Sequence, residues 1–202
     1  MTQASQTLRE ITGMGFNHAS LKDSALIMVD CQNTYRHGVM QLTNIEPAIL
    51  EAQKLLMMAR DLKIPIMHIQ HDAGVGTPYD ITAEIGAISA EVAPKNGEAV
   101  VIKNYPNAFW HTTLEAQLKA LGVENVVLAG FMTHMCINSS ARGAFNLGFK
   151  STVVASACAT RSLVGPQGKV IDAQTMHDSA LATVRDLFAV VVDDLADLTA
   201  KH

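Results

Sequence analysis

Short apolar runs alternate along this chain with longer segments whose apolar residues recur every three to four positions. The short runs are uninterrupted enough to predict strands that are buried on both faces. They lie at 25–29, 64–69, 99–102, 125–129, 151–155 and 189–192, and helical spacing covers 45–62, 114–121, 133–147 and 172–187. Such alternation is typical of a parallel sheet covered by helices. We therefore predict an α/β three-layer sandwich with a central, mostly parallel six-stranded sheet and helices on both faces, a Rossmann-like arrangement.

Two segments fall outside this alternation. Residues 1–24 are mostly polar and mix both charges, which predicts an N-terminal arm ahead of a domain at 25–202. The arm has no apolar block long enough for a signal peptide or a membrane span, so we expect a cytoplasmic protein that does not bind membranes. The stretch 70–97 contains several Gly and Pro residues and predicts a functional loop or lid.

Composition narrows the possible partners. The chain has 202 residues, is 49% hydrophobic and carries a formal net charge of −4, with no run of Lys or Arg that would follow a phosphate backbone. We therefore expect a small-molecule substrate and no nucleic acid. The three cysteines, Cys31, Cys136 and Cys158, form no CxxC pair and favour neither a disulfide framework nor a zinc site.

Three chemically complementary residues are placed at the ends of predicted strands. Asp30 follows the first strand, Lys103 follows the third, and Cys136 lies in the first turn of the helix after the fourth. The carboxyl ends of parallel strands meet at one edge of a sheet, where ligands bind. A thiol near a helix N-terminus is expected to have a lowered pKa and to act as a nucleophile, with Asp30 as proton acceptor and Lys103 as stabilising charge.

The same residue types also occur without catalysis. A cysteine after a strand is often a small buried hydrophobic residue, and Asp or Lys at a strand end is often a cap or a solvated pair. Two other hypotheses on the function therefore stay open at this point. One is a dinucleotide-binding or flavodoxin-like protein, although Asp30 to Val39 lacks the glycine-rich phosphate loop that it needs. The other is a non-catalytic binding or assembly protein that retains the fold.

Three segments carry a resemblance to a known family. They are Val29-Asp30-Cys31-Gln32, Ile102-Lys103, and Gly130-Phe131-Met132-Thr133-His134-Met135-Cys136 with its continuation to Arg142. In this order they resemble the isochorismatase-like cysteine hydrolases, and the resemblance extends from Ala25 to Asp194. It implies a catalytic triad in which Asp30 is the acid/base, Lys103 the catalytic lysine and Cys136 the nucleophile. It also implies a cis peptide between Phe131 and Met132, and an oxyanion hole formed by the N–H groups of Met132 and Cys136.

The resemblance also implies a reaction and a mode of assembly. Cys136 would attack an amide or ureido carbonyl, an amine would leave, and water would hydrolyse the thioester, without a cofactor. A hydrolase acting on a non-amide bond stays open as an alternative. Relatives with a metal site carry several histidines after the first strand, whereas residues 36–44 contain only His37, so we predict no catalytic metal. Members of the family usually form homo-oligomers, which we expect here too.

Five further residues are candidates for the substrate pocket because they follow Asp30, follow Lys103 or precede Cys136 closely in sequence. Aromatic rings provide apolar walls with occasional polar groups for small planar substrates. The alternative for Phe109 and Trp110 is packing beneath the next helix or in a subunit interface. The candidates are Tyr35, Tyr105, Phe109, Trp110 and His134.

Overall fold

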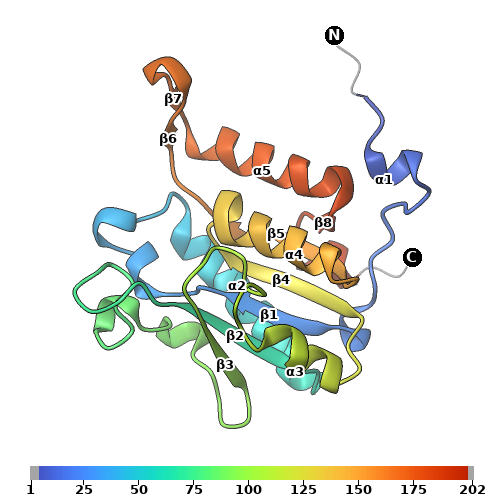
Figure 1. The fold of residues 1–202 in the computed structure, drawn as a ribbon, viewed down its shortest axis with the longest axis horizontal. Helices are drawn as coiled ribbons and strands as arrows, with labels where there is room; N and C mark the ends of the chain where they lie inside the picture. The colour runs from blue at the N-terminus through green and yellow to red at the C-terminus, as the bar shows by residue number, and fades with distance from the viewer. Residues whose placement is uncertain (1–4, 200–202) are drawn as a thin grey trace.

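A six-stranded parallel sheet forms the centre of the protein in the computed structural model, which describes residues 5–199 (Figure 1). Its strands follow the spatial order β3-β2-β1-β4-β5-β8, and every neighbouring pair is parallel. They span Ala25–Val29 (β1), Ile66–His71 (β2), Ala99–Lys103 (β3), Asn125–Phe131 (β4), Lys150–Ala159 (β5) and Val190–Val192 (β8). The predicted fold class is confirmed.

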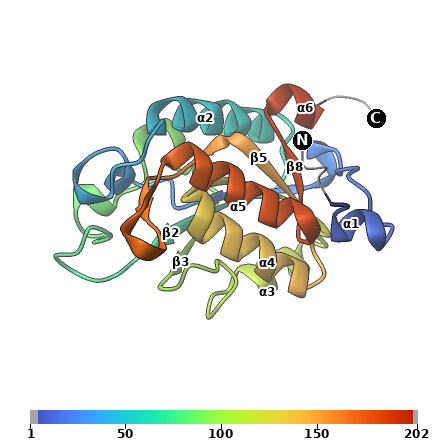
Figure 2. The same ribbon diagram turned by 90° about the horizontal axis from the view of Figure 1, so that it is seen from above.

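Helices cover both faces of the sheet (Figure 2). Helix α2 (Ile45–Asp61) and the short α6 (Leu195–Thr199) lie on one face, and α3 (Leu114–Ala120), α4 (Asn138–Asn146) and α5 (Ala173–Leu187) lie on the other. Strand β1 contributes side chains to the cores on both faces of the sheet. Leu26 and Met28 pack in the core beneath α2, whereas Ile27 and Val29 pack in the core beneath α3 to α5. Because successive strand side chains point to opposite faces, a continuous apolar run is what a sheet buried on both faces requires.

Two regions differ from the sequence-based expectation. Strand β5 continues past residue 155 to Ala159, after a register irregularity against β4. Beyond it, Leu163–Val164 (β6) and Val170–Ile171 (β7) form an antiparallel hairpin that projects from the body in Figure 1. Apolar periodicity missed both, because residues 156–159 are small and the hairpin strands have only two residues each.

The N-terminal arm packs against the body of its own chain. Its short helix α1 (Leu8–Ile11) contacts α5, where the Leu8 N–H donates to Asp186 Oδ1 and the Arg9 side chain donates to the Leu187 carbonyl. The predicted arm 1–24 and domain 25–202 include residues 1–4 and 200–202, which lie outside the described residues. Among residues 5–199, no helix is both long and apolar enough to cross a membrane.

Candidate active site

The carboxyl ends of three strands bring Asp30, Lys103 and Cys136 into contact. Lys103 Nζ lies 2.7 Å from Asp30 Oδ2 and 3.3 Å from Cys136 Sγ, so the ammonium bridges the carboxylate and the thiol. All three residues are removed from water, with exposed fractions of 0% for Asp30, 1% for Lys103 and 5% for Cys136. A buried ion pair offsets the loss of hydration only when further contacts compensate its charges. Here Lys103 also contacts His71 and Cys136, whereas Asp30 Oδ1 has no hydrogen-bond partner among the described residues.

Backbone geometry at the end of β1 and β4 shapes the site. Asp30 adopts a left-handed conformation with φ of 50°, which is unfavourable for a residue with a Cβ atom and is concentrated at functional sites in proteins. Beside it, Gly130 has φ of 123°, and a Cβ there would lie 2.0 Å from the Val29 carbonyl oxygen. Gly130 therefore allows β4 to approach β1 closely just before the turn that contains Cys136.

Cys136 lies in a π-helical turn, Thr133–Ile137, that leads into α4. The N–H groups of Met135 and Ile137 both donate to the Met132 carbonyl. The Thr133 side chain hydrogen-bonds His177 Nδ1 of α5 at 2.9 Å, and no side chain caps the turn. The peptide bond between Phe131 and Met132 is cis.

Burial sets the proton affinities in the site. It raises the pKa of the Cys136 thiol, and the charge of Asp30 raises this pKa further against the opposing effect of Lys103. The expected lowering of the Cys136 pKa is therefore wrong, because burial and the neighbouring carboxylate outweigh the effect of a helix N-terminus. Burial likewise raises the pKa of Asp30, although Lys103 opposes this. For Lys103, burial disfavours the ammonium, but Asp30 and Cys136 outweigh it and the pKa is raised. The site thus holds an ammonium beside a thiol that needs a base to ionise.

Two of the predicted substrate-binding residues border this centre. Tyr35 is buried and packs edge-on against Phe131 and Tyr79, and its pKa is raised by burial and by the charges of Asp30 and Cys136. His134 is half-buried, and its Nδ1 hydrogen-bonds the Thr160 hydroxyl. These contacts place an aromatic ring and an imidazole beside the segment that contains Cys136.

The other three candidates make their contacts elsewhere. Tyr105 and Trp110 are 50% and 57% exposed, and their rings contact His111. Phe109 is buried in the core beneath α3 to α5 and stacks on Phe149 with ring centroids 5.7 Å apart. Phe109 thus follows the packing alternative, whereas contact with substrate stays a prediction for Tyr105 and Trp110.

Arg161 was not among the candidates, although it follows the predicted fifth strand closely. Its Nε is buried and has no hydrogen-bond partner among the described residues. Burial lowers the pKa of the neighbouring His134, and the charge of Arg161 lowers it further. Burial raises the pKa of Tyr79, and the charge of Arg161 weakly opposes this. No spacing rule in the sequence places a guanidinium that follows one strand beside a site formed by other strands.

The two histidines of β2 lie on opposite faces of the sheet. His71 Nδ1 is 3.0 Å from Lys103 Nζ at the site, whereas buried His68 contacts Glu98 at 2.9 Å on the α2 face. The side chains therefore diverge, as alternation along a strand requires. Within residues 5–199, no cluster of three or more His, Cys, Asp or Glu side chains is arranged to hold a metal ion.

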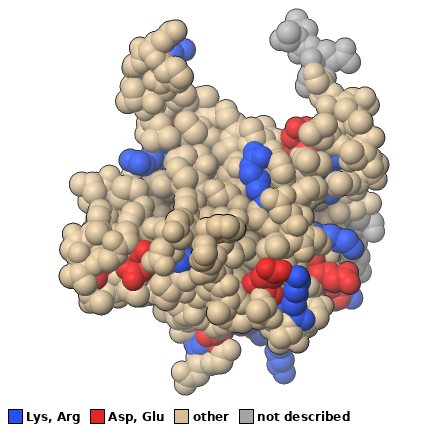
Figure 3. All heavy atoms as spheres, viewed as in Figure 1, with Lys and Arg blue, Asp and Glu red and all other residues tan. Residues whose placement is uncertain are grey.

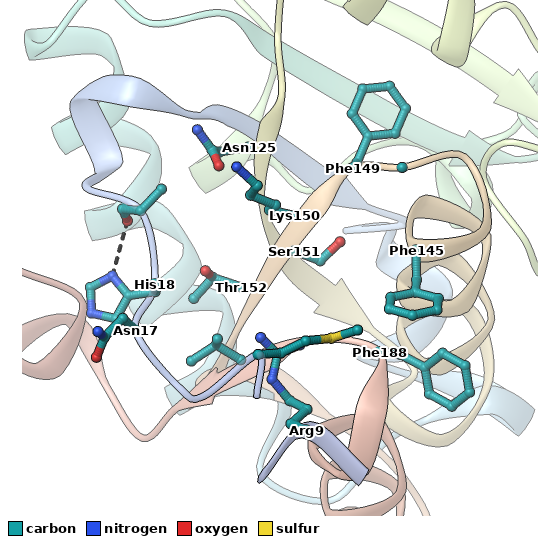
Figure 4. A pocket seen from close by; sticks show the side chains of 14 residues that line it. Arg9, Asn17, His18, Asn125, Phe145, Phe149, Lys150, Ser151, Thr152 and Phe188 are labelled. Atoms are coloured by element: carbon teal, nitrogen blue, oxygen red, sulfur yellow. Dashed lines mark hydrogen bonds between the residues drawn. The ribbon is translucent and has the colours of Figure 1, made fainter. Parts of the chain in front are cut away.

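A separate cavity of about 570 Å³ lies at the opposite, amino-terminal end of the strands (Figure 4). The arm residues Arg9 and His18 close it on one side, and the rings of Phe145 and Phe188 line another. Arg9 donates to the carbonyls of Gly15 and Leu187, so it serves to hold the arm in place. This cavity is therefore remote from the three-residue centre. On the face seen in Figure 3, Lys and Arg side chains are scattered among Asp and Glu and form no continuous basic surface.

A parallel α/β fold with a buried thiol, carboxylate and ammonium at its strand ends defines the class of cysteine hydrolases. Comparison with known families agrees: the isochorismatase domain model matches residues 24–194, so this chain belongs to the isochorismatase family. The predicted family of hydrolases is thereby confirmed, and the relatives of this chain include amidohydrolases.

Individual relatives cover most of the chain. It is 32% identical over 187 residues to the secreted isochorismatase effector of Verticillium dahliae, covering 92% of this chain and 96% of that protein. It is 33% identical over 153 residues to the maleamate amidohydrolase of Pseudomonas putida, covering 64% of this chain and 69% of that protein. The crystal structure of an isochorismatase from Pseudomonas putida matches with a TM-score of 0.90 at 33% identity, covering 94% of this chain and 97% of that one.

Proposed function

We propose that this protein hydrolyses an amide or ureido C–N bond of a small molecule through a Cys136 thioester. The observation that carries the proposal is the position of Lys103 Nζ, within 2.7 Å of Asp30 Oδ2 and 3.3 Å of Cys136 Sγ. One cation in contact with both a base and a nucleophile stabilises the charge that passes between them.

Acylation begins when Asp30 accepts the thiol proton while Cys136 Sγ attacks the carbonyl carbon. Because burial raises the pKa of Asp30, its carboxyl group holds that proton more firmly than an exposed aspartate does. The N–H groups of Met132 and Cys136 stabilise the resulting oxyanion in this proposal. When the C–N bond breaks, Asp30 returns the proton to the leaving nitrogen, and a thioester remains on Cys136.

Deacylation uses the same groups in reverse. Asp30 accepts a proton from a water molecule as the water oxygen attacks the thioester carbonyl carbon. The C–S bond then breaks, the acid product is released, and the Cys136 sulfur recovers its proton from Asp30. Lys103 stays an ammonium throughout, because its raised pKa favours the charged form.

We further propose that the substrate carries a carboxylate near the scissile group. Arg161 supports this, because its buried Nε has no partner among the described residues and a guanidinium pairs with carboxylates by charge-assisted hydrogen bonds. The similarity to maleamate amidohydrolase also supports it, since maleamate is the monoamide of a dicarboxylic acid. Tyr35, His134 and, in the exposed segment, Tyr105 and Trp110 are the proposed further contacts with substrate.

The test is ammonia release from paired amides that differ only in a carboxylate, such as succinamate and butyramide, together with maleamate, ureido acids and nicotinamide. We expect turnover of acidic amides by wild type, a loss of about 10³-fold or more in Cys136→Ala, and an acyl adduct on the Cys136 peptide after acid quenching. Retained turnover in Cys136→Ala would remove the thioester mechanism. Binding without turnover or adduct would favour the non-catalytic alternative.

Location and assembly are also proposals. We propose a cytoplasmic homo-oligomer, on the basis of membership in this family. The Verticillium dahliae relative is named as secreted, so cell fractionation is the direct check of location. Light scattering after size exclusion measures the oligomeric state. A monomer at micromolar concentration would contradict the proposed homo-oligomer.

A further inference from the structure

We propose that His71 is a positioning residue whose Nδ1 accepts a hydrogen bond from Lys103 and holds the ammonium between Asp30 and Cys136. The inference rests on the proposed function, because it concerns the same centre, but it assigns a role to a residue outside the triad.

Strand register brings His71 to this position. His71 and Lys103 are direct partners in the parallel pairing of β2 with β3, and both end their strands. Because Ile69 and Val101 pack in the core beneath α3 to α5, alternation places His71 and Lys103 on that same face. The Nζ–Nδ1 distance of 3.0 Å is that of a normal hydrogen bond.

This contact completes the surroundings of the ammonium. A lysine ammonium has three N–H donors and no acceptor. Its close contacts are Asp30 Oδ2 at 2.7 Å, His71 Nδ1 at 3.0 Å and Cys136 Sγ at 3.3 Å. Each donor therefore has one partner, and removal of His71 leaves a buried N–H without one.

His71 is itself held in place. The Gln32 side chain accepts from the His71 N–H at 2.9 Å and donates to the His71 carbonyl at 3.0 Å. The Asp72 N–H donates to the Lys103 carbonyl at 2.9 Å, and the Tyr79 ring packs edge-on against the imidazole with centroids 4.9 Å apart. A group fixed on both its backbone and its ring can fix the orientation of a flexible lysine.

An acceptor role requires Nδ1 without a proton. Burial and then the charge of Lys103 lower the pKa of His71 to about 4, and Asp72 opposes this. Lys103 of β3, Asp72 after β2 and Tyr79 of the following loop are the charged or titratable groups that face the ring. The imidazole is therefore neutral near pH 7, with its proton on Nε2.

Three variants of His71 separate positioning from packing. His71→Asn keeps an oxygen acceptor near Nδ1, His71→Gln moves the acceptor away from Lys103, and His71→Leu removes it. His68→Leu is the matched control, because His68 is buried on the same strand but faces α2. Thermal unfolding first identifies the variants that fold. If His71→Leu does not fold, His71→Gln alone tests the loss of the acceptor.

The main measurement is the pH dependence of Cys136 alkylation by iodoacetamide, followed by mass spectrometry of its peptide. In Leu and Gln variants of His71 we expect the midpoint to rise by on the order of one pH unit, because a displaced ammonium stabilises the thiolate less. The Asn variant and His68→Leu should keep the wild-type midpoint. For turnover, we expect kcat to fall about 10- to 100-fold in the Leu and Gln variants with KM nearly unchanged, and recovery in Asn.

The outcomes distinguish the two proposals. If wild type hydrolyses no amide, the proposed function fails, while the alkylation midpoints still report on Lys103 and Cys136. If the Leu and Gln variants keep the wild-type midpoint, or if Asn is impaired as much as Leu, the positioning role of His71 is wrong.

Discussion

The two ends of the central sheet differ in where their charged side chains lie and in what compensates those charges. At the carboxyl end, Asp30, Lys103 and Cys136 are buried and interact with one another. Their charges are compensated by partners in fixed positions and not by water, an arrangement that preorganises a site for reactions in which charge moves.

At the amino-terminal end, charges stay near the surface and serve the fold. Arg60 of α2 makes two hydrogen bonds to Glu98, just before β3, and these side chains are 18% and 12% exposed. Glu98 also contacts His68. At the same end of the sheet, the cavity beneath the arm contains a buried Ser151 hydroxyl with no partner among the described residues. The comparison teaches that buried charges in mutual contact are concentrated at the carboxyl end of the sheet.

Removal of the central cation should have the largest effect. Lys103→Met leaves the Asp30 carboxylate buried without its partner, which we expect to lower the free energy of unfolding by about 3–5 kcal/mol and to abolish turnover. Urea denaturation at pH 7 measures the first effect and ammonia release the second.

The control is the double variant Asp30→Asn, Lys103→Met. Because no charge is then left unpaired, we expect it to recover most of the lost stability while it stays inactive. A single Lys103→Met variant as stable as wild type would contradict the view that the carboxyl end depends on mutual compensation of charge.

Glu98 at the other end should have a smaller and pH-dependent effect. Hydrogen bonds from Arg60, and with less effect from the Lys95 N–H and His68, lower the pKa of Glu98 to about 2 against the opposing effect of burial. A lowered carboxyl pKa contributes stability above the unfolded-state value near 4.3, and this contribution is lost as the pH falls toward 2. Glu98→Gln should therefore lower the free energy of unfolding by about 2 kcal/mol at pH 7. Its difference from wild type should shrink as the pH falls from the unfolded-state pKa, near 4.3, toward the folded-state pKa of about 2.

Urea denaturation of both proteins at several pH values tests this prediction. Glu115→Gln is the matched control, because Glu115 pairs with Lys119 on the exposed surface of α3 and should contribute less than about 0.5 kcal/mol. A Glu98 effect that does not change with pH would show that the ion pair with Arg60 is not its source.

Sequence predicted the layers of the fold better than the details of the site. Apolar runs buried on both faces specified the six strands, since that pattern has few other solutions. Placement of Asp30 and Lys103 at strand ends was also readable, and the structure brings these residues together. The contact of His71 with Lys103 could not be predicted from the sequence, because it depends on the register in which β2 pairs with β3. Local reasoning failed for the pKa of Cys136 for the same reason, because burial depends on distant segments.

The smallest effect is expected for Ser151, beneath the arm. Its hydroxyl is buried without a partner among the described residues, so removal of the oxygen sacrifices no hydrogen bond that the structure shows. Ser151→Ala should therefore leave the unfolding free energy unchanged or raise it by up to about 1 kcal/mol, and turnover should stay at the wild-type level. Thr152→Val, on the next residue of β5, is the comparison variant in the same cavity. A loss of more than about 1 kcal/mol in Ser151→Ala would mean that a polar partner, such as an ordered water, compensates this hydroxyl, and that the amino-terminal end of the sheet also compensates its buried polar groups.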